Sequence, residues 1–306
     1  MYATLPPAGG RAAGTGRLRI TAIARRAFDG PPEITRQAGH EAHLRRYLSD
    51  MLRPYGITLR DSVAGHSYGE MAAVLTGELA APGQPVDLLV LAFAIPDIRP
   101  GRATATYLSE VCPGRPFAFA ICDQGGAAAF TGLRLVGEYL RAGTCRRALL
   151  LVVEQAALPY HTGVPVEVPT GHTAVGLRCE PAGQVAVSRV RQHADVSPQR
   201  AGDLLADALA EARGGVAGAG EVTLVTDARL AARLPGPTVG QVRVAPSGRP
   251  HTGVWWELAA ALHRPAGTPS ATAGERLLLA SYDRQLRYLC LATIDRTSAP
   301  PQQVSR

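Results

Sequence analysis

The residues that could serve as covalent nucleophiles in this 306-residue sequence include cysteines and hydroxyl-bearing residues but no lysine, which the chain lacks. Its 32 Lys+Arg residues are all arginine, and asparagine is absent as well. These absences exclude Schiff-base chemistry, a phosphate-loop lysine and any triad that includes asparagine. Acyl transfer stays open, since it needs a thiol or hydroxyl nucleophile, one general base and backbone amides for the oxyanion.

The elements that must position such residues follow an α/β pattern, in which short β-rich apolar runs alternate with amphipathic stretches. We predict strands at Leu18–Ala24, Asp87–Ala94, Pro116–Cys122, Arg147–Glu154, His172–Arg178, Val185–Val190, Val222–Thr226, Arg276–Ser281 and Leu286–Thr293. We predict helices at Glu41–Leu52, Tyr68–Ala80, Ala127–Ala142, Pro198–Arg213, Asp227–Leu234 and Gly253–His263. Near residues 180–183 the chain turns and begins a second, shorter series of strands and helices.

Composition indicates a globular protein with a sizeable core, since 46% of the residues are hydrophobic and 19% are charged. The net charge of +7 is spread as single arginines and arginine pairs, and only 5% of the residues are aromatic. Nucleic-acid-binding proteins usually show a basic stripe with stacking aromatics, so we expect no nucleic-acid partner. Dispersed arginine suits an acidic protein partner or a phosphate-bearing ligand.

Cysteine content and hydropathy indicate the cellular compartment. The five cysteines are odd in number and form no CxxC pair, which argues against a disulfide framework and against a metal site. No apolar run approaches the ~18 residues of a membrane span, and residues 1–16 lack the apolar core of a signal peptide. We therefore expect a cytoplasmic protein without a membrane anchor, with flexible termini at residues 1–16 and 298–306.

Four stretches of the sequence carry a family resemblance through their order and spacing. They are residues 56–92, with a helix from Ser67 and a strand at Val86–Ala92; Pro116–Cys122, with the helix Phe130–Gly143 and the strand Arg147–Glu154; Thr170–Leu177; and Pro250–Thr252, with Glu275–Leu279 and Leu286–Thr293. Together they resemble the β-ketoacyl-acyl-carrier-protein synthase III branch of the thiolase superfamily across residues 17–295.

The resemblance implies the thiolase fold, an α/β/α/β/α five-layered sandwich of two pseudo-symmetric halves, here residues 17–180 and 181–297. It implies an acyl thioester substrate on an acyl carrier protein or coenzyme A, with no other cofactor. It also implies a homodimer across Pro116–Cys122, or a heterodimer with an active ketosynthase. The composition, which suggests a GC-rich source, and the altered site described next indicate a role in secondary metabolism.

The catalytic positions of the family are all changed in this sequence. Family members use a cysteine at the start of the buried helix, a histidine in a Pro-His-Gln-Ala-Asn segment and an asparagine in a Gly-Asn-Thr turn. The cysteine position falls on Gln124 counted from the preceding strand and on Gly126 counted from the end of the helix. Asp227 stands at the histidine position and His251 at the asparagine position. Asp283 lies where the family has a glycine-rich loop.

Without asparagine and the first histidine, the chain is poorly equipped for decarboxylative carbon–carbon bond formation. Acyl transfer from a thioester to an oxygen, nitrogen or sulfur acceptor asks for less. Our hypothesis is a site in which Cys122 is the nucleophile, His251 the general base and Asp227 the residue that orients it. The residues that we expect to contact substrate or form the oxyanion hole are Gln124, Gly125, Gly126, His161 and Asp283.

Two alternatives stay open beside this hypothesis. Gln124 is similar to the glutamine that replaces cysteine in chain-length-type relatives, whose partner subunit carries the thiol, so the chain could be a catalytically silent subunit. Each candidate also has an ordinary structural role available, since a buried Cys122 is a common core residue and Asp227 a common N-cap. A pocket filled by Asp283 and its neighbours would favour the silent subunit.

A rival motif lies at residues 65–70, where Gly-His-Ser-Tyr-Gly-Glu has the GxSxG form. It resembles the GHSxGE segment of malonyl-type acyltransferases, in which the serine is the nucleophile. The residues before Gly65 make a poor buried strand, which that motif requires. We therefore expect Ser67 to be a helix N-cap, with Glu70 completing a capping box, and keep a Ser67-dependent acyltransferase as a minor alternative.

Overall fold

The computed structural model describes most of the chain and leaves out both termini. The residues that it describes are 18–30, 38–60, 65–80, 83–99, 103–163, 165–214, 222–234, 240–263 and 275–296. The termini for which the sequence predicted flexibility, 1–16 and 298–306, lie outside these residues.

The first series of elements ends at residue 180. It comprises β1 (Arg19–Phe28), α1 (Ala38–Leu52), the 3-10 helix η1 (Arg53–Tyr55), α2 (Tyr68–Leu79), β2 (Leu88–Ala92), α3 (Thr104–Val111), β3 (Phe117–Ile121), α4 (Ala127–Arg141), β4 (Ala148–Glu154) and β5 (His172–Glu180). The second series comprises β6 (Val185–His193), α5 (Pro198–Gly214), β7 (Val222–Thr226), α6 (Ala228–Ala231), β8 (Gln241–Val244), α7 (Gly253–Leu262), β9 (Arg276–Asp283) and β10 (Tyr288–Arg296).

The two series repeat one topology. The strand order is β3-β2-β4-β5-β1 in the first and β8-β7-β9-β10-β6 in the second, and the two halves join where β1 pairs with β6. In each half the three strands at the outer edge are parallel and the two toward the junction are antiparallel. α4 and α7 occupy equivalent places in the repeat. This equivalence confirms the two pseudo-symmetric halves expected from the sequence.

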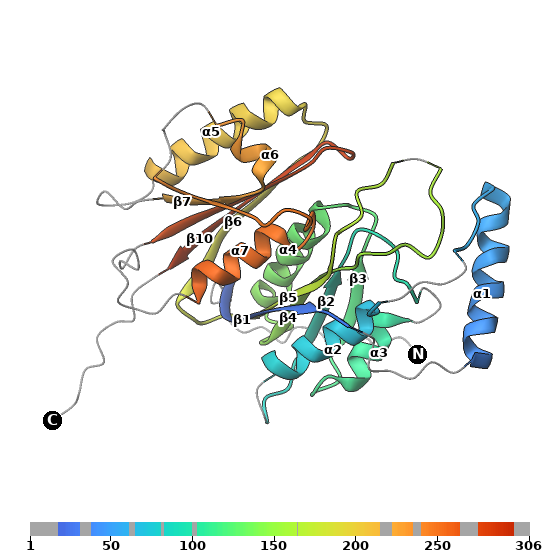
Figure 1. Cartoon of the computed structure of the whole chain (residues 1–306). Coiled ribbons are helices and arrows are strands. Elements are labelled where there is room, and N and C mark those ends of the chain that lie inside the picture. Colours follow the sequence, from blue (N-terminus) through green and yellow to red (C-terminus); the bar gives the residue numbers. More distant parts are fainter. Residues whose placement is uncertain are drawn as a thin grey trace.

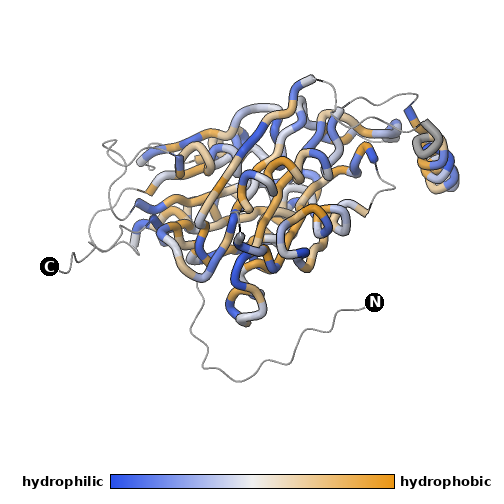
Figure 2. Tube along the Cα trace, turned by 90° about the horizontal axis from the view of Figure 1, so that it is seen from below, coloured by the Kyte–Doolittle hydropathy of each residue, from blue (hydrophilic) through white to orange (hydrophobic). Residues whose placement is uncertain are grey.

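The halves stack as five layers (Figure 1). α4 and α7 form the middle layer, because each contacts strands of both halves. α2 and α3 cover the outer face of the first half, while α5 and α6 cover the outer face of the second. β2 and β4, which lie between two helical layers, are buried along their whole length, which explains why they read as unbroken apolar runs. Figure 2 shows these hydrophobic stretches passing through the middle of the molecule.

The middle layer is closely packed. Trp255 of α7 and Phe130 of α4 are fully buried, and their ring centroids lie 4.9 Å apart. Gly132 lets α4 approach β4, since a Cβ at this position would lie 2.7 Å from Cδ1 of Leu150. The apolar stripe of α4 and the largely apolar α7 thus fill the space between the two sheets.

Every strand and helix predicted from the sequence overlaps an observed one, but α3 and β8 were not predicted. β8 is a four-residue edge strand whose side chains alternate between partly buried and exposed, so its apolar signal is short and weak. α3 has eight residues, two of which are threonines with low helix propensity. The helix predicted at Asp227–Leu234 is the shorter α6.

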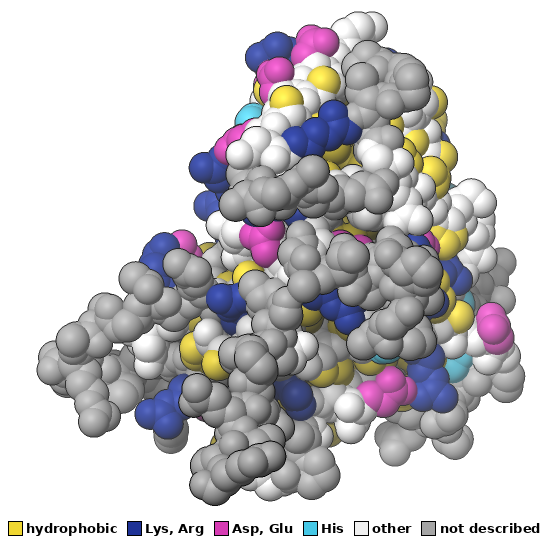
Figure 3. Space-filling view, turned by 90° about the vertical axis from the view of Figure 1, so that its left-hand side faces the viewer, with side chains coloured by type: hydrophobic (Ala, Val, Ile, Leu, Met, Phe, Trp, Pro, Cys, Tyr) yellow, Lys and Arg dark blue, Asp and Glu magenta, His cyan; other side chains and the backbone are white. Residues whose placement is uncertain are grey.

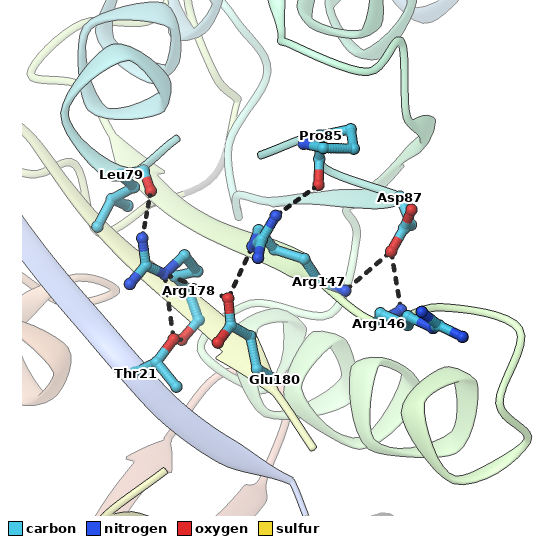
Figure 4. A network of polar contacts seen from close by, with 8 residues as sticks. All are labelled: Thr21, Leu79, Pro85, Asp87, Arg146, Arg147, Arg178 and Glu180. Carbon is cyan, nitrogen blue, oxygen red and sulfur yellow. Dashed lines mark hydrogen bonds and ion pairs between the residues drawn. The ribbon is translucent and has the colours of Figure 1, made fainter. Parts of the chain in front are cut away.

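A polar network holds the first sheet together at the end opposite Glu154 (Figure 4). The Asp87 carboxylate accepts hydrogen bonds from the backbone N–H groups of Arg146 and Arg147 at 2.8 and 2.9 Å. Arg147 Nε lies 2.7 Å from Oε1 of Glu180, and Arg178 donates to Oγ1 of Thr21 and to the backbone oxygen of Leu79. These contacts join β1, β4, β5 and the end of α2, and lie far from the site described below.

The arginines are dispersed over the surface. On the face shown in Figure 3 they stand apart from one another, with acidic side chains beside several of them. Exposed pairs such as Arg26–Glu78 contribute little to stability because solvent screens them. Among the described residues, no helix is long and apolar enough to cross a membrane, and no group of three or more His, Cys, Asp or Glu side chains could hold a metal ion.

Candidate functional site

A cavity of about 270 Å³ lies where the N-terminus of α4, the turn before α7 and the β9–β10 turn meet. These three segments come from both halves of the fold. The polar residues that line the cavity are Asp123, Glu167, His251, Ser281, Tyr282, Asp283, Arg284 and Gln285, and Gly125 and Gly126 line it as well. Of the residues predicted for the site, the structure brings His251, Asp283, Gly125 and Gly126 together here.

His251 is a partly buried histidine that burial keeps uncharged. Burial lowers the pKa of its imidazole, and the carboxylates of Glu154, Asp283 and Glu167 act in the opposite direction. Nδ1 is buried and has no hydrogen-bond partner among the described residues. A neutral imidazole surrounded by carboxylates can take up a proton at neutral pH, because the carboxylates stabilise the imidazolium that forms.

Asp283 of the β9–β10 turn reaches the backbone at the start of α4. Its Oδ2 accepts a hydrogen bond of 2.9 Å from the Gly126 N–H, and its Oδ1 accepts bonds of 3.0 Å from the N–H groups of Gln285 and Leu286. A Cβ on Gly125 would lie 1.9 Å from Oδ2, so the carboxylate excludes any side chain there. The helix N-terminus favours this anion. A cysteine therefore cannot stand at Gly125 unless Asp283 moves.

Gln124 is fixed by a hydrogen bond of its own. Its Oε1 accepts from Thr131 Oγ1 at 2.6 Å, and Oγ1 of Thr131 accepts from Gln192 Nε2 at 3.0 Å. Thr131 of α4 therefore joins Gln124, just before the helix, to Gln192 of β6 in the second half. This hydrogen bond gives the Gln124 side chain a structural role that requires no contact with substrate.

Cys122 lines a different cavity, of about 450 Å³, with Tyr68, Phe93 and Asp97. Asp123 lines both this cavity and that of His251, so the two adjoin. The thiol is exposed and lies 3.2 Å from Oδ2 of Asp123. Burial, the hydrogen bond to Asp123 and the charge of that carboxylate raise the pKa of Cys122. The thiolate that a nucleophile requires is therefore disfavoured.

Asp227 caps a helix. Its Oδ1 accepts a hydrogen bond of 2.9 Å from the Leu230 N–H, and its Oδ2 lies 3.4 Å from the Tyr282 N–H. It lines a third cavity, of about 180 Å³, which shares Glu167 and Ser281 with that of His251. Cys122, His251 and Asp227 thus line three adjoining cavities, and the structure does not gather them into one triad.

His161 and Ser67 lie outside the His251 cavity. The His161 side chain is exposed, and its backbone N–H donates to the Thr58 oxygen at 2.9 Å. Ser67 is 1% exposed and is the N-cap of α2, with the complete capping box to Glu70 that the sequence predicted. The Ser67 hydroxyl is used in this cap, since it accepts the Glu70 N–H at 3.3 Å.

Several residues of the site were not predicted from the sequence, among them Glu154, Glu167 and Ser281. Glu154 is completely buried and bonds to the backbone of His251, while Glu167 and Ser281 line the cavity of His251. The signal for Glu154 was available, because a carboxylate that ends an otherwise apolar, fully buried strand needs a partner. Glu167 and Ser281 carried no such signal.

The stacking of two equivalent halves around α4 and α7 is that of the thiolase fold, and solved structures agree. The chain is similar to ChlB3, described as an acyltransferase, with a TM-score of 0.62 and 16% identity over 92% of this chain and 98% of that chain. It is similar to AbyA1, a tetronic acid condensing enzyme, with a TM-score of 0.61 and 18% identity over 91% and 99% of the two chains. It is also similar to the priming β-ketosynthase of the R1128 polyketide biosynthetic pathway, with a TM-score of 0.59 and 13% identity over 95% of this chain and 100% of that chain.

These likenesses confirm the fold that the sequence predicted. No protein-family model matches the chain, and no curated protein matches its sequence. At identities of 13% to 18% the structural likeness establishes the thiolase fold, while the chemistry has to be argued from the site of this chain.

Proposed function

We propose that this chain is an acyltransferase that moves an acyl group from a thioester, carried by coenzyme A or an acyl carrier protein, directly to an oxygen, nitrogen or sulfur acceptor. The observation that carries the proposal is the environment of His251, an imidazole whose pKa is lowered by burial, in a cavity where the Asp283 carboxylate covers Gly125 at the start of α4. His251 is the general base, and no acyl-enzyme forms at the start of α4.

The proposed step needs no covalent intermediate on the protein. The acceptor heteroatom forms a bond to the thioester carbonyl carbon while His251 takes the proton from that heteroatom. The carbon–sulfur bond then breaks, and the leaving thiolate receives the proton from the imidazolium. Glu154, Asp283 and Glu167 favour the imidazolium between these two events. Nothing else is consumed, since the acyl group and one proton exchange places.

The carrier and the biological setting are extensions of this proposal. The arginine-rich surface suits a phosphopantetheine phosphate or an acidic carrier helix. The descriptions of AbyA1 and of the R1128 ketosynthase name tetronic acid and polyketide biosynthesis, and we extend a role in secondary metabolism to this chain.

The proposal is tested by incubating the protein with acetyl-CoA and hexanoyl-CoA, with N-acetylcysteamine and ethanolamine as acceptors. We expect release of CoA that depends on the acceptor, measured by chromatography. Intact-mass spectrometry should show that the protein itself stays unmodified. An acyl adduct on the peptide that contains Cys122 would contradict direct transfer if Cys122→Ala lost both the adduct and the activity. Cys122 would then be the nucleophile.

A second candidate, the catalytically silent subunit, is favoured by one specific contact. The Gly126 N–H, which stands where an oxyanion donor is expected, is already bonded to Asp283. Such a subunit would bind a nucleophile-bearing ketosynthase. Release of CoA with none of the acceptors, together with a stable complex with a ketosynthase, would favour this candidate over the first.

β3 is the strand at which we expect a second copy of an active acyltransferase to bind. This strand lies at the edge of the sheet, carries no charge, and exposes Phe117 by 56%. Phe117 clusters with Phe119 and with Tyr139 of α4. An uncharged, aromatic edge strand is a template for pairing with another strand. We propose that a second copy pairs there.

Phe117→Arg should convert this dimer to a monomer, because the substitution places a charge in the paired edge. Size-exclusion chromatography with light scattering measures the change. The matched control is Val242→Arg in β8, the edge strand of the other half, which exposes Val242 by 38% and should leave the dimer intact. A wild-type chain that is monomeric at micromolar concentration would contradict pairing through β3.

A further inference from the structure

Glu154 is a completely buried carboxylate at the end of β4, and it holds the turn that carries His251. Its Oε2 accepts hydrogen bonds from the backbone N–H groups of His251 at 2.9 Å and Thr252 at 3.2 Å. Its Oε1 accepts from Oγ1 of Thr252 at 2.5 Å and from Oγ1 of Thr173 at 2.8 Å. Both oxygens are thus satisfied without water.

Three of the four bonds cross the junction between the halves. Glu154 and Thr173 face each other on the paired strands β4 and β5 of the first half. His251 and Thr252 lie 97 and 98 residues away, at the N-terminus of α7 in the second half. The carboxylate therefore fixes the position of the His251 backbone relative to the first half, including the cavity wall at Gly125 and Gly126.

The charge of Glu154 is balanced by a helix terminus. Among the described residues Glu154 forms no ion pair, and its Oε2 accepts two N–H groups at the start of α7. Anions are stabilised at that end of a helix. Because the carboxylate is buried, its field on nearby groups is screened less than that of a surface charge.

We infer that Glu154 is a positioning residue for His251, which fixes the backbone of the histidine and stabilises the imidazolium that forms during acyl transfer. The inference rests on the proposed function for its catalytic meaning, while the effect on His251 can be measured without turnover. The other charged groups that face this histidine or its turn are Asp283 and Arg284 of the β9–β10 turn, Glu167 and Asp123 of the cavity wall, and Arg249 of the same turn.

The test is the pKa of His251 in the Glu154→Gln variant. It is measured by NMR titration of the histidine ring signals, and His251→Ala serves to assign the resonance. Loss of the negative charge should lower the pKa of His251 by about one unit, which is a tenfold change in proton affinity. In an activity assay, the acid limb of the kcat/KM profile should move to lower pH and the plateau rate should fall.

Thr173→Val is the matched control, because it removes one hydrogen bond to the same carboxylate and keeps the charge. It should lower thermal stability and leave the pKa of His251 unchanged. If Glu154→Gln does not fold, Glu154→Asp, which withdraws the carboxylate from the turn, should shift the pKa in the same direction by less.

The outcomes separate this inference from the proposed function. A folded Glu154→Gln variant whose His251 pKa equals that of the wild type would overturn the inference, even if acyl transfer is observed. Absence of acyl transfer with every acceptor, together with a lowered His251 pKa, would instead contradict the proposed function and leave the electrostatic role of Glu154 standing.

Discussion

Replacing His251 by alanine should lower the rate of acyl transfer by about 10²- to 10⁴-fold, which is the usual contribution of a general base. His251 is the histidine that lines the cavity between α4 and the β9–β10 turn. The loss should appear in kcat/KM, measured as acceptor-dependent release of CoA. Because burial lowers the pKa of His251, the wild-type rate should rise as the histidine loses its proton at a pH below about 6.5, and it should be level at neutral pH.

The control for this prediction is Cys122→Ala, which changes the thiol of the neighbouring cavity and should leave the rate close to that of the wild type. Circular dichroism of both variants tests whether the fold is kept. A His251→Ala protein with undiminished transfer would contradict the role of general base. A Cys122→Ala protein that loses transfer as completely as His251→Ala would contradict direct transfer and favour an acyl-enzyme.

Replacing Trp255 by alanine should lower the free energy of unfolding by about 3–5 kcal/mol, the usual cost of removing a large aromatic side chain from a core. Trp255 is 0% exposed and packs on Phe130, so its removal leaves a cavity in the helical layer that both sheets share. The loss can be measured as a shift of the midpoint in urea unfolding. We expect a loss of this size because α4 and α7 hold the two sheets apart, so the sheets cannot close over the cavity that the missing side chain leaves.

The adjacent Trp256 supplies a matched control. It is partly buried, and the guanidinium carbons of Arg25 and Arg249 lie over its ring, 4.7 and 3.8 Å from the ring centroid. Trp256→Ala removes cation–π contacts, each of which contributes roughly 0.5–1 kcal/mol at exposed sites, and should cost less than Trp255→Ala. Equal losses in the two variants would contradict the placement of α7 between the sheets.

The order of strands and helices was predictable because its signals are local. β2 is a short apolar run, β4 is apolar up to its last residue, Glu154, and the helical period of α4 is visible in its own residues. β8 and α3 were missed because their own signals are weak, since β8 is a four-residue edge strand and α3 has two threonines in eight residues. The capping box of Ser67 and Glu70 was predicted for the same local reason, as both partners lie within one turn.

The composition and the family resemblance identified the residues that could carry chemistry, and they excluded lysine and asparagine from any role. The tertiary structure decided which of those residues meet. Asp283 reaches the Gly126 N–H from 157 residues away, and Glu154 reaches the His251 turn from 97 residues away. No local period encodes these contacts, because they depend on how the two halves stack. The sequence alone therefore determined the fold and named His251, while the packing of the halves determined that a carboxylate, rather than Cys122, stands beside it.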